Sequence, residues 1–343
     1  MSFSIASGTR DVLPSECLAL AWFYHRRFES LTPPLGIPRV VLSTRVRKPF
    51  REILLSFRTL RLLLNSRPKV VLVQNPSLIC TLLIALLRPF FGYQIVVDAH
   101  GDAVIPYAHN WKVVRAVTFF LLKYAALTIV TNLGLAARVL AHGGRPFVLC
   151  DNLPTVSEHC RSDLGPGKHV MFISTYASDE PHAELFQAAE MLRSKGVTFH
   201  VTGKVRSDTL SRLPPKPDNV VLTGFLAEHD YWRLLVSCDV VVDLTTMPDC
   251  LVCGAYEAIA AGRALVLTDN APSRELFENA ALYTENCASA IAARVTDALM
   301  RQAELEAAAQ RHAVKMQSTW DLKARGLTRL IAAGLIDSEH NGR

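Results

Sequence analysis

Short runs of aliphatic and β-branched residues alternate with longer segments of helical periodicity along the first half of the chain. The short runs predict strands at Leu18–Tyr24, Arg39–Leu42, Lys69–Gln74, Gln94–Asp98, Leu127–Thr131 and Phe147–Asp151. The longer segments predict helices at Phe50–Asn65, Pro76–Phe91, Trp111–Ala125 and Leu133–Ala141. Near-continuous apolar strands are typical of parallel strands that are buried on both faces. Their alternation with helices predicts a doubly wound α/β domain.

The alternation stops between Asn152 and His169, where the chain is polar and rich in proline and glycine, and it then restarts. Further strands are predicted at Val170–Ser174, Phe199–Thr202, Val220–Gly224, Val240–Leu244 and Ala264–Thr268. A long surface helix at Ala288–Lys315 and a final helix at Trp320–Ala333 follow. We therefore expect four parts: a Rossmann-like domain at 1–152, a linker at 153–169, a second Rossmann-like domain at 170–318, and a C-terminal helix and tail at 319–343.

Composition narrows the class of protein. Half of the 343 residues are hydrophobic and 20% are charged, which suits a packed core and excludes an intrinsically disordered chain. The apolar stretch Leu78–Leu87, which is interrupted by Thr81, is too short for a membrane-spanning helix, which needs about 20 residues. Neither Gly-x-Gly-x-x-Gly nor Gly-x-x-x-x-Gly-Lys-Ser/Thr occurs, so a nicotinamide dehydrogenase and a P-loop NTPase lose their main support.

The net charge of +6 is divided unevenly between the halves. Residues 1–150 contain 18 Lys and Arg against 6 Asp and Glu, whereas residues 151–343 contain 19 against 25. A basic half indicates a negatively charged partner, which could be a membrane surface, a phosphate-bearing substrate or a nucleic acid. A solvated basic face without any partner is the alternative.

Candidate chemistry is densest between Asp243 and Asp269. Asp249 and Glu257 flank the start of a predicted helix, and Gly254 lies between them. The first N–H groups of a helix and its dipole form a cradle for phosphate. Glu257 could then accept hydrogen bonds from ribose hydroxyls, and Asp249 could hold a sugar ring. The alternative is a turn residue and a solvated helix position.

This segment resembles the nucleotide-sugar donor motif of GT-B glycosyltransferases, especially the large retaining group. The similarity continues through Gly262, the strand Ala264–Thr268 and the segment Ala271–Glu275. The resemblance implies a GT-B fold, in which two Rossmann-like doubly wound domains face a cleft. It also implies that Glu257 binds ribose and that Asp249 binds hydroxyls of the donor sugar. Asp249 departs from the usual Glu, whose reach is one methylene longer.

Other segments resemble the chitobiosyldiphosphodolichol β-mannosyltransferase type of enzyme. They are, in order along the chain, 69–76, 95–101, 174–181, 201–204, 220–225 and 230–231. Asp98 and His100 end a predicted strand, and the resemblance implies that a His there contacts the donor sugar. An acid or His in the first domain could instead deprotonate the acceptor hydroxyl of an inverting enzyme. The alternatives are a turn histidine at position 100 and a capping role for Asp98.

Two basic groups are candidates for binding anions. Lys204 and Arg206 follow a predicted strand beside Gly203, and they could neutralise a diphosphate leaving group. The loop 175–182 lacks the Arg and Lys that most retaining GT-B enzymes carry there. In the first half, the residues expected to face an acceptor or a membrane are His25, Arg26, Arg27, Arg47 and Lys48. Phe50, Leu54 and Phe57 are interleaved with the second basic run, a combination that suits anionic lipid headgroups.

The sequence thus predicts a glycosyltransferase, with a hexosyltransferase as the expected type, that uses a nucleoside-diphosphate sugar as co-substrate. The expected acceptor is lipid-linked or a growing cell-surface polysaccharide. The enzyme is expected in the cytoplasm, peripherally on the inner face of the membrane. No cofactor, metal or nucleic-acid partner is expected, because no Asp-x-Asp motif or nucleic-acid motif occurs. The alternatives are a non-transferring GT-B relative such as a nucleotide-sugar epimerase and a non-catalytic anion-binding protein.

Overall fold

The computed structural model describes residues 14–75, 77–99, 101–104, 112–156, 161–204 and 213–333. The chain divides into two compact units, of which unit 1 comprises residues 1–152 and 319–343 and unit 2 comprises residues 153–318. Each unit contains one six-stranded sheet in which all neighbouring strands are parallel. This arrangement confirms the predicted α/β class.

Unit 1 has the strand order β2-β1-β3-β4-β5-β6. Its strands are β1 (Cys17–Ala21), β2 (Arg39–Val41), β3 (Val70–Gln74), β4 (Gln94–Asp98), β5 (Leu127–Val130) and β6 (Pro146–Val148). Its first helices are α1 (Arg26–Leu31), α2 (Phe50–Ser66), α3 (Leu78–Phe91), α4 (Lys112–Tyr124) and α5 (Leu133–Ala141), with short 3₁₀ turns at Pro14–Glu16 and Gly101–Ala103. Side-chain caps fix two helix starts: Ser77 accepts from the Cys80 N–H at α3, and Asn132 accepts from the Leu135 N–H at α5.

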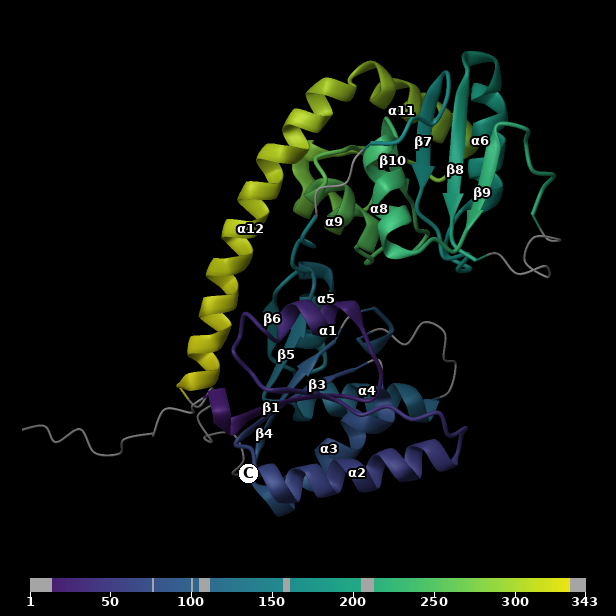
Figure 1. Cartoon of the computed structure of the whole chain (residues 1–343). Helices are drawn as coiled ribbons and strands as arrows, with labels where there is room; N and C mark the ends of the chain where they lie inside the picture. The colour runs from purple at the N-terminus through teal and green to yellow at the C-terminus, as the bar shows by residue number, and fades with distance from the viewer. Residues whose placement is uncertain are drawn as a thin grey trace, which may run out of the picture. The chain divides into compact units, whose positions relative to one another are not determined.

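The sheet of unit 1 is covered on both faces (Figure 1). Side chains of α2, α3, α4 and α5 pack together with one set of strand residues, including Val71 and Val73. The alternate strand residues, including Leu72, pack with α1 and with the C-terminal part of the chain. This two-sided burial is the reason that the strands read as continuous apolar runs.

Unit 2 has the strand order β12-β11-β10-β7-β8-β9. Its strands are β7 (Lys168–Phe172), β8 (Val197–Thr202), β9 (Val220–Gly224), β10 (Val240–Asp243), β11 (Ala264–Thr268) and β12 (Leu282–Thr284). Its helices are α6 (His182–Leu192), α8 (Glu228–Ser237), α9 (Cys253–Ala260), α10 (Ala271–Phe277) and α11 (Ala288–Met300), with 3₁₀ turns at Arg193–Lys195 and Glu278–Ala280.

The C-terminal helices differ from the prediction. The break falls at Arg301, after which α12 (Gln302–Ala332) runs as a single helix. No Gly or Pro lies between Lys315 and Trp320, and the Ser318 hydroxyl donates to the Lys315 carbonyl within the helix, so nothing ends it there. The first part of α12 belongs to unit 2 and the part from residue 319 belongs to unit 1. In unit 1 it buries Trp320, Ala324, Leu327 and Ile331 in the core that contains Phe28 and Leu31.

Candidate functional site

The sheet order of unit 2 indicates where a ligand would bind. β7 pairs with β8 on one side and with β10 on the other, so the chain direction across the sheet reverses between β7 and β10. Open parallel sheets bind ligands beyond the carboxyl ends of their strands at such a switch point. The loops that follow β7 and β10, residues 173–181 and 244–252, therefore form the candidate site together with the start of α9.

Glu257 lies in α9, one turn after the helix begins, and only 6% of it is exposed. The hydroxyl of Tyr231, from α8, donates a hydrogen bond to Glu257 Oε2. Glu257 is therefore not a solvated helix position, which was one of the two interpretations of the sequence. Asp249 lies half-buried in the loop between β10 and α9.

Asp243 ends β10 and is buried against the first turn of α9. A Cβ built on Gly254 would lie only 2.4 Å from Asp243 Oδ2. Glycine is thus required here by close packing. Burial raises the pKa of Asp243 well above its ordinary value, and the carboxylates of Glu180 and Glu257 raise it further.

The predicted role of Gly254 in phosphate binding stays a prediction. Gly254 lies in the first turn of α9, directly against the Asp243 carboxyl group. The dipole of α9 is directed at the same place, because Asp243 and the loop before α9 both adjoin its first turn.

The loop after β7 forms a nest of hydrogen-bond donors around Glu180 that the sequence did not predict. Glu180 accepts hydrogen bonds from the N–H groups of Thr175 (3.0 Å) and Tyr176 (2.9 Å), and from the hydroxyls of Ser174 and Thr175. Tyr176 has a φ of 59°, so its backbone turns left-handed and directs successive N–H groups to one point. A carboxylate of the protein itself therefore fills a cradle suited to an anion.

The surroundings of Glu180 keep it ionised. His182 Nε2 lies 3.2 Å from its Oε2, and the His182 ring stacks on Tyr176. Burial alone would raise the pKa of Glu180, but hydrogen bonds from His182 and from the loop outweigh burial and lower it. The usable signal in the sequence was the hydroxyl pair Ser174 and Thr175 followed by an acid just before a helix.

Gly203 and Lys204 follow β8 at the same edge of the sheet. Gly203 has a φ of 95°, and a Cβ there would lie 2.3 Å from the Ser174 carbonyl oxygen, so glycine alone allows this approach. Lys204 is exposed next to it. Arg206 lies outside the described residues, and so does His100 in the first unit.

Polar bonds join the loops of this edge to one another. The Thr245 hydroxyl donates to Asp179 Oδ2 at 2.7 Å, which links the loop after β10 to the loop after β7. The Thr245 N–H donates to the Thr268 hydroxyl, and Asn286 donates to the Thr245 carbonyl. These bonds hold the loops after β7, β10, β11 and β12 together, so the candidate site is built on a fixed frame.

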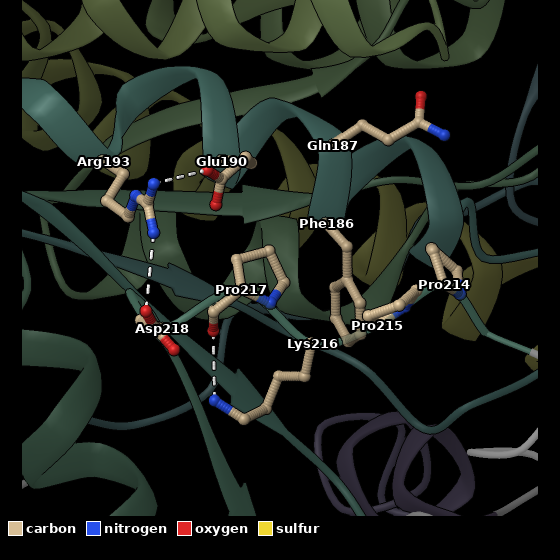
Figure 2. A pocket seen from close by; sticks show the side chains of 9 residues that line it. All are labelled: Phe186, Gln187, Glu190, Arg193, Pro214, Pro215, Lys216, Pro217 and Asp218. Carbon is tan, nitrogen blue, oxygen red and sulfur yellow. Dashed lines mark hydrogen bonds and ion pairs between the residues drawn. The ribbon is translucent and has the colours of Figure 1, made fainter.

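A pocket elsewhere in unit 2 does not coincide with this edge. It has a volume of about 380 Å³ and is lined by Phe186, Gln187, Glu190, Arg193 and residues 214–218 (Figure 2). Arg193 pairs with Glu190 and Asp218, and Lys216 donates to the Pro217 carbonyl. Its cations are thus already paired, and residues 214–218 precede β9, which places the pocket at the opposite end of that strand.

In unit 1 the structure corrects the predicted roles of Arg27 and Asp98. Arg27 is only 4% exposed, so it cannot face a membrane or an acceptor in solution. Its guanidinium donates to Asp98 Oδ1 at 2.8 Å, to the Leu149 carbonyl at 2.9 Å and to Asp151 Oδ1. Burial alone would lower the pKa of Arg27, but the two carboxylates outweigh it and raise it. Asp98, fully buried, is thus a structural ion-pair partner.

The other predicted residues of unit 1 are more accessible. Arg26, Arg47 and Lys48 are exposed, and His25 is half-buried before α1. Two residues that the prediction did not single out are Gln74, which ends β3 opposite Asp98, and Asn75, which follows it; they are 1% and 2% exposed. Within the part of the chain that the structure describes, the Gln74 amide and the Asn75 Nδ2 have no hydrogen-bond partner.

Residues 167–301 match the family model described as "Glycosyl transferases group 1". The structure of Anabaena HepE in complex with UDP-glucose is similar to the chain, with a TM-score of 0.71 and 16% identity over 92% of this chain and 99% of that one. The fold is GT-B. The galactosyltransferase WaaB of the lipopolysaccharide outer core is also similar, with a TM-score of 0.61, 12% identity and coverage of 92% and 99%.

A protein from Listeria monocytogenes described as a UDP-N-acetylglucosamine 2-epimerase has a TM-score of 0.61 at 13% identity, over 92% of this chain and 95% of that one. The GT-B fold is thus shared by transferring and non-transferring enzymes. A search of curated proteins gives no match. The predicted similarity to the mannosyltransferase type of enzyme stays a prediction.

Within this GT-B chain, the predicted site residues fall into two groups. Gly203, Lys204, Asp249, Gly254 and Glu257 belong to the carboxyl edge of the sheet of unit 2, whereas the remaining described ones belong to unit 1. No helix in the described ranges combines the length and apolarity that crossing a bilayer requires. Among the same residues, no three His, Cys, Asp or Glu side chains are grouped as ligands of a metal ion would be.

Proposed function

We propose that the protein is a glycosyltransferase that takes its sugar from a nucleoside-diphosphate sugar bound to unit 2. One observation carries the proposal: a buried carboxylate, Glu257, is held by Tyr231 one turn into α9, at the switch point of the sheet. Glu257 also lies inside the segment that matches the glycosyltransferase family model. A carboxylate fixed in this way is suited to accept hydrogen bonds from the two hydroxyls of a ribose.

The remaining residues of the edge receive roles from their positions. Asp249, in the loop before α9, binds hydroxyls of the donor sugar, and Lys204 neutralises the diphosphate as the glycosidic bond breaks. Arg206 is the second candidate cation for this role. Gly203 lets the chain pass close to the Ser174 carbonyl, at the point where Lys204 follows β8. A fixed cation at the leaving group stabilises the developing charge without proton transfer.

We further propose that unit 1 binds the acceptor, that the transferred sugar is a hexose, and that the acceptor is lipid-linked or a growing cell-surface polysaccharide. His100 is the candidate base for the acceptor hydroxyl, since Asp98 is held by Arg27. The basic excess of residues 1–150 supports a position on the inner face of an anionic membrane. No metal is required if α9 and Lys204 together balance the diphosphate.

Nucleotide binding tests the proposal. A thermal-shift series with UDP, GDP, ADP and dTDP should give stabilisation by one of them, about 2.7 kcal/mol at a concentration of 100 times its Kd. Glu257→Ala should remove this shift, while Glu228→Ala, which changes an exposed glutamate at the start of α8, should leave it unchanged. A shift that survives Glu257→Ala undiminished contradicts the donor-site assignment.

An epimerase is the second candidate, because the Listeria structure named for that activity has the same fold. The two functions differ in whether they require an acceptor. A transferase consumes a nucleotide sugar only when an acceptor is present, whereas an epimerase converts it alone. Incubation of the protein with labelled donor and no acceptor therefore separates them: conversion to an epimer contradicts the glycosyltransferase proposal.

A further inference from the structure

Helix α3 is apolar on its outward face as well as its inward face. Cys80, Thr81, Ile84 and Ala85 are buried toward the sheet. On the opposite side, Ile79, Leu86 and Phe90 are 49%, 59% and 83% exposed. A surface helix of a globular protein normally places polar side chains on its outer face. The outer face of α3 therefore differs from an ordinary solvated helix face.

The neighbouring helices extend this apolar surface. α3 contacts α2 and α4, and all three cover the same face of the sheet of unit 1 (Figure 1). Large apolar side chains that are exposed on these flanking helices are Phe50, Ile53, Phe57 and Leu64 on α2 and Val113 and Phe120 on α4. We call the outer side of these three helices the α2–α4 face. Large exposed apolar side chains gathered on neighbouring helices are typical of an interaction site.

The charges around the α2–α4 face are almost all positive. Its exposed basic residues, together with those just before α2, are Arg47, Lys48, Arg58, Arg61, Lys112, Arg115 and Lys123. The only acid in residues 45–91 and 112–125 is Glu52, which pairs with Arg51. Two copies of this chain would therefore repel each other if they met through this face. The occupant must combine an apolar interior with a negative surface.

We propose that the α2–α4 face docks on an anionic phospholipid bilayer, with Ile79, Leu86 and Phe90 inserted shallowly at its centre. This inference rests on the proposed function at a membrane and specifies which surface makes the contact. Apolar side chains enter the boundary between headgroups and acyl chains, while the surrounding Lys and Arg side chains meet the lipid phosphates. The surface is built on α3 and its neighbours rather than on the segment His25–Arg27, where Arg27 is buried.

Co-sedimentation with vesicles tests this proposal on the full chain. We expect binding to phosphatidylcholine vesicles to rise with their phosphatidylglycerol content and to fall at high salt. Ile79→Ser/Leu86→Ser/Phe90→Ser should abolish most of the binding. The matched control Met191→Ser/Met300→Ser/Val314→Ser changes three exposed apolar residues of unit 2 and should bind like wild type.

The charges are tested separately. Arg58→Glu/Arg61→Glu/Arg115→Glu should weaken binding by more than about 100-fold, because each basic side chain near an anionic surface contributes about fivefold. The control Lys195→Glu/Arg311→Glu/Arg325→Glu changes exposed residues that lie off the α2–α4 face and should lose far less. Equal losses in the two charge variants would overturn the proposal, as would wild-type binding by the triple serine variant of α3.

Two further readouts separate this inference from the proposed function. Light scattering of the free protein measures self-association. If wild type is a dimer and the triple serine variant of α3 is a monomer, the α2–α4 face binds a second copy of the chain, and the bilayer proposal is wrong. The nucleotide thermal shift should be the same in the α3 variant as in wild type. If that shift is absent in both while vesicle binding behaves as expected, the docking surface stands and the glycosyltransferase proposal falls.

Discussion

Replacement of Arg27 by methionine should destabilise unit 1 strongly, although Arg27 belongs to a run of basic residues that reads as a surface. Its guanidinium is 2% exposed and faces Asp98, which is completely buried. Removing one partner of a buried ion pair costs about 3–5 kcal/mol, because the other charge remains buried without compensation. In a domain of this size each kcal/mol lowers Tm by roughly 2–4 °C. We therefore expect Tm to fall by roughly 6–20 °C.

The adjacent residue provides the control. Arg26→Met changes the same type of side chain at an exposed position, where substitutions usually alter stability by about 0.5 kcal/mol or less. Urea unfolding of both variants at neutral pH measures the difference directly. Arg27→Met/Asp98→Asn should recover part of the loss, because the remaining amide carries no charge. If Arg27→Met costs no more than Arg26→Met, the buried pair does not stabilise unit 1 and the reasoning fails.

Three further predictions concern unit 2. Lys204→Ala should weaken binding of a nucleoside diphosphate, measured by calorimetry, at least tenfold more than binding of the free nucleoside. Equal losses for the two ligands would mean that the phosphate site lies elsewhere. Because the pKa of Glu180 is lowered, its stabilising contribution is present above about pH 4.3 and is lost as pH falls through the folded value. Below pH 5, the Tm of Glu180→Gln should therefore decrease less steeply with falling pH than the Tm of wild type and of the control Glu184→Gln. Burial lowers the pKa of His200, and His169 lowers it further, so unfolding free energy should decrease as pH drops below about 6.5. His200→Gln should flatten that decrease, and an unchanged slope would show that the histidine pair is not its cause.

Most strands could be predicted because each appears in the sequence as a short, nearly continuous apolar run. Both faces of Val70–Gln74 and of Val240–Asp243 are buried, so every position had to be apolar except the last. The edge strand β12 was not predicted. Its three residues, Leu282–Thr284, are too few to show a period, and only pairing with β11 identifies them.

The environments of charged residues could not be predicted, because they depend on distant partners. Arg27 meets Asp98 and Asp151, which lie 71 and 124 positions further along the chain. A basic run after a strand looks the same in the sequence whether its members are buried or exposed. Glu257 was identified through its spacing from Asp249, but its hydrogen-bond partner Tyr231 lies 26 residues earlier in the chain.

The nest around Glu180 shows the same limit at short range. All of its donors lie within the segment 174–182, yet the left-handed turn at Tyr176 that brings them together is unusual for a residue other than glycine. A pattern of residue types does not reveal a backbone conformation that the types themselves disfavour.

Helix α12 determines when unit 1 can finish folding during synthesis. The core of this unit includes Trp320, Leu327 and Ile331, which the ribosome adds only after all of unit 2. At typical elongation rates of 5–20 residues per second, translation of residues 153–318 takes on the order of 10–30 s. Throughout that interval the nascent N-terminal half exposes the apolar surface that α12 will cover. Unit 2, whose segment is continuous, can be complete first, so the half of the protein that is made first is the half that is finished last.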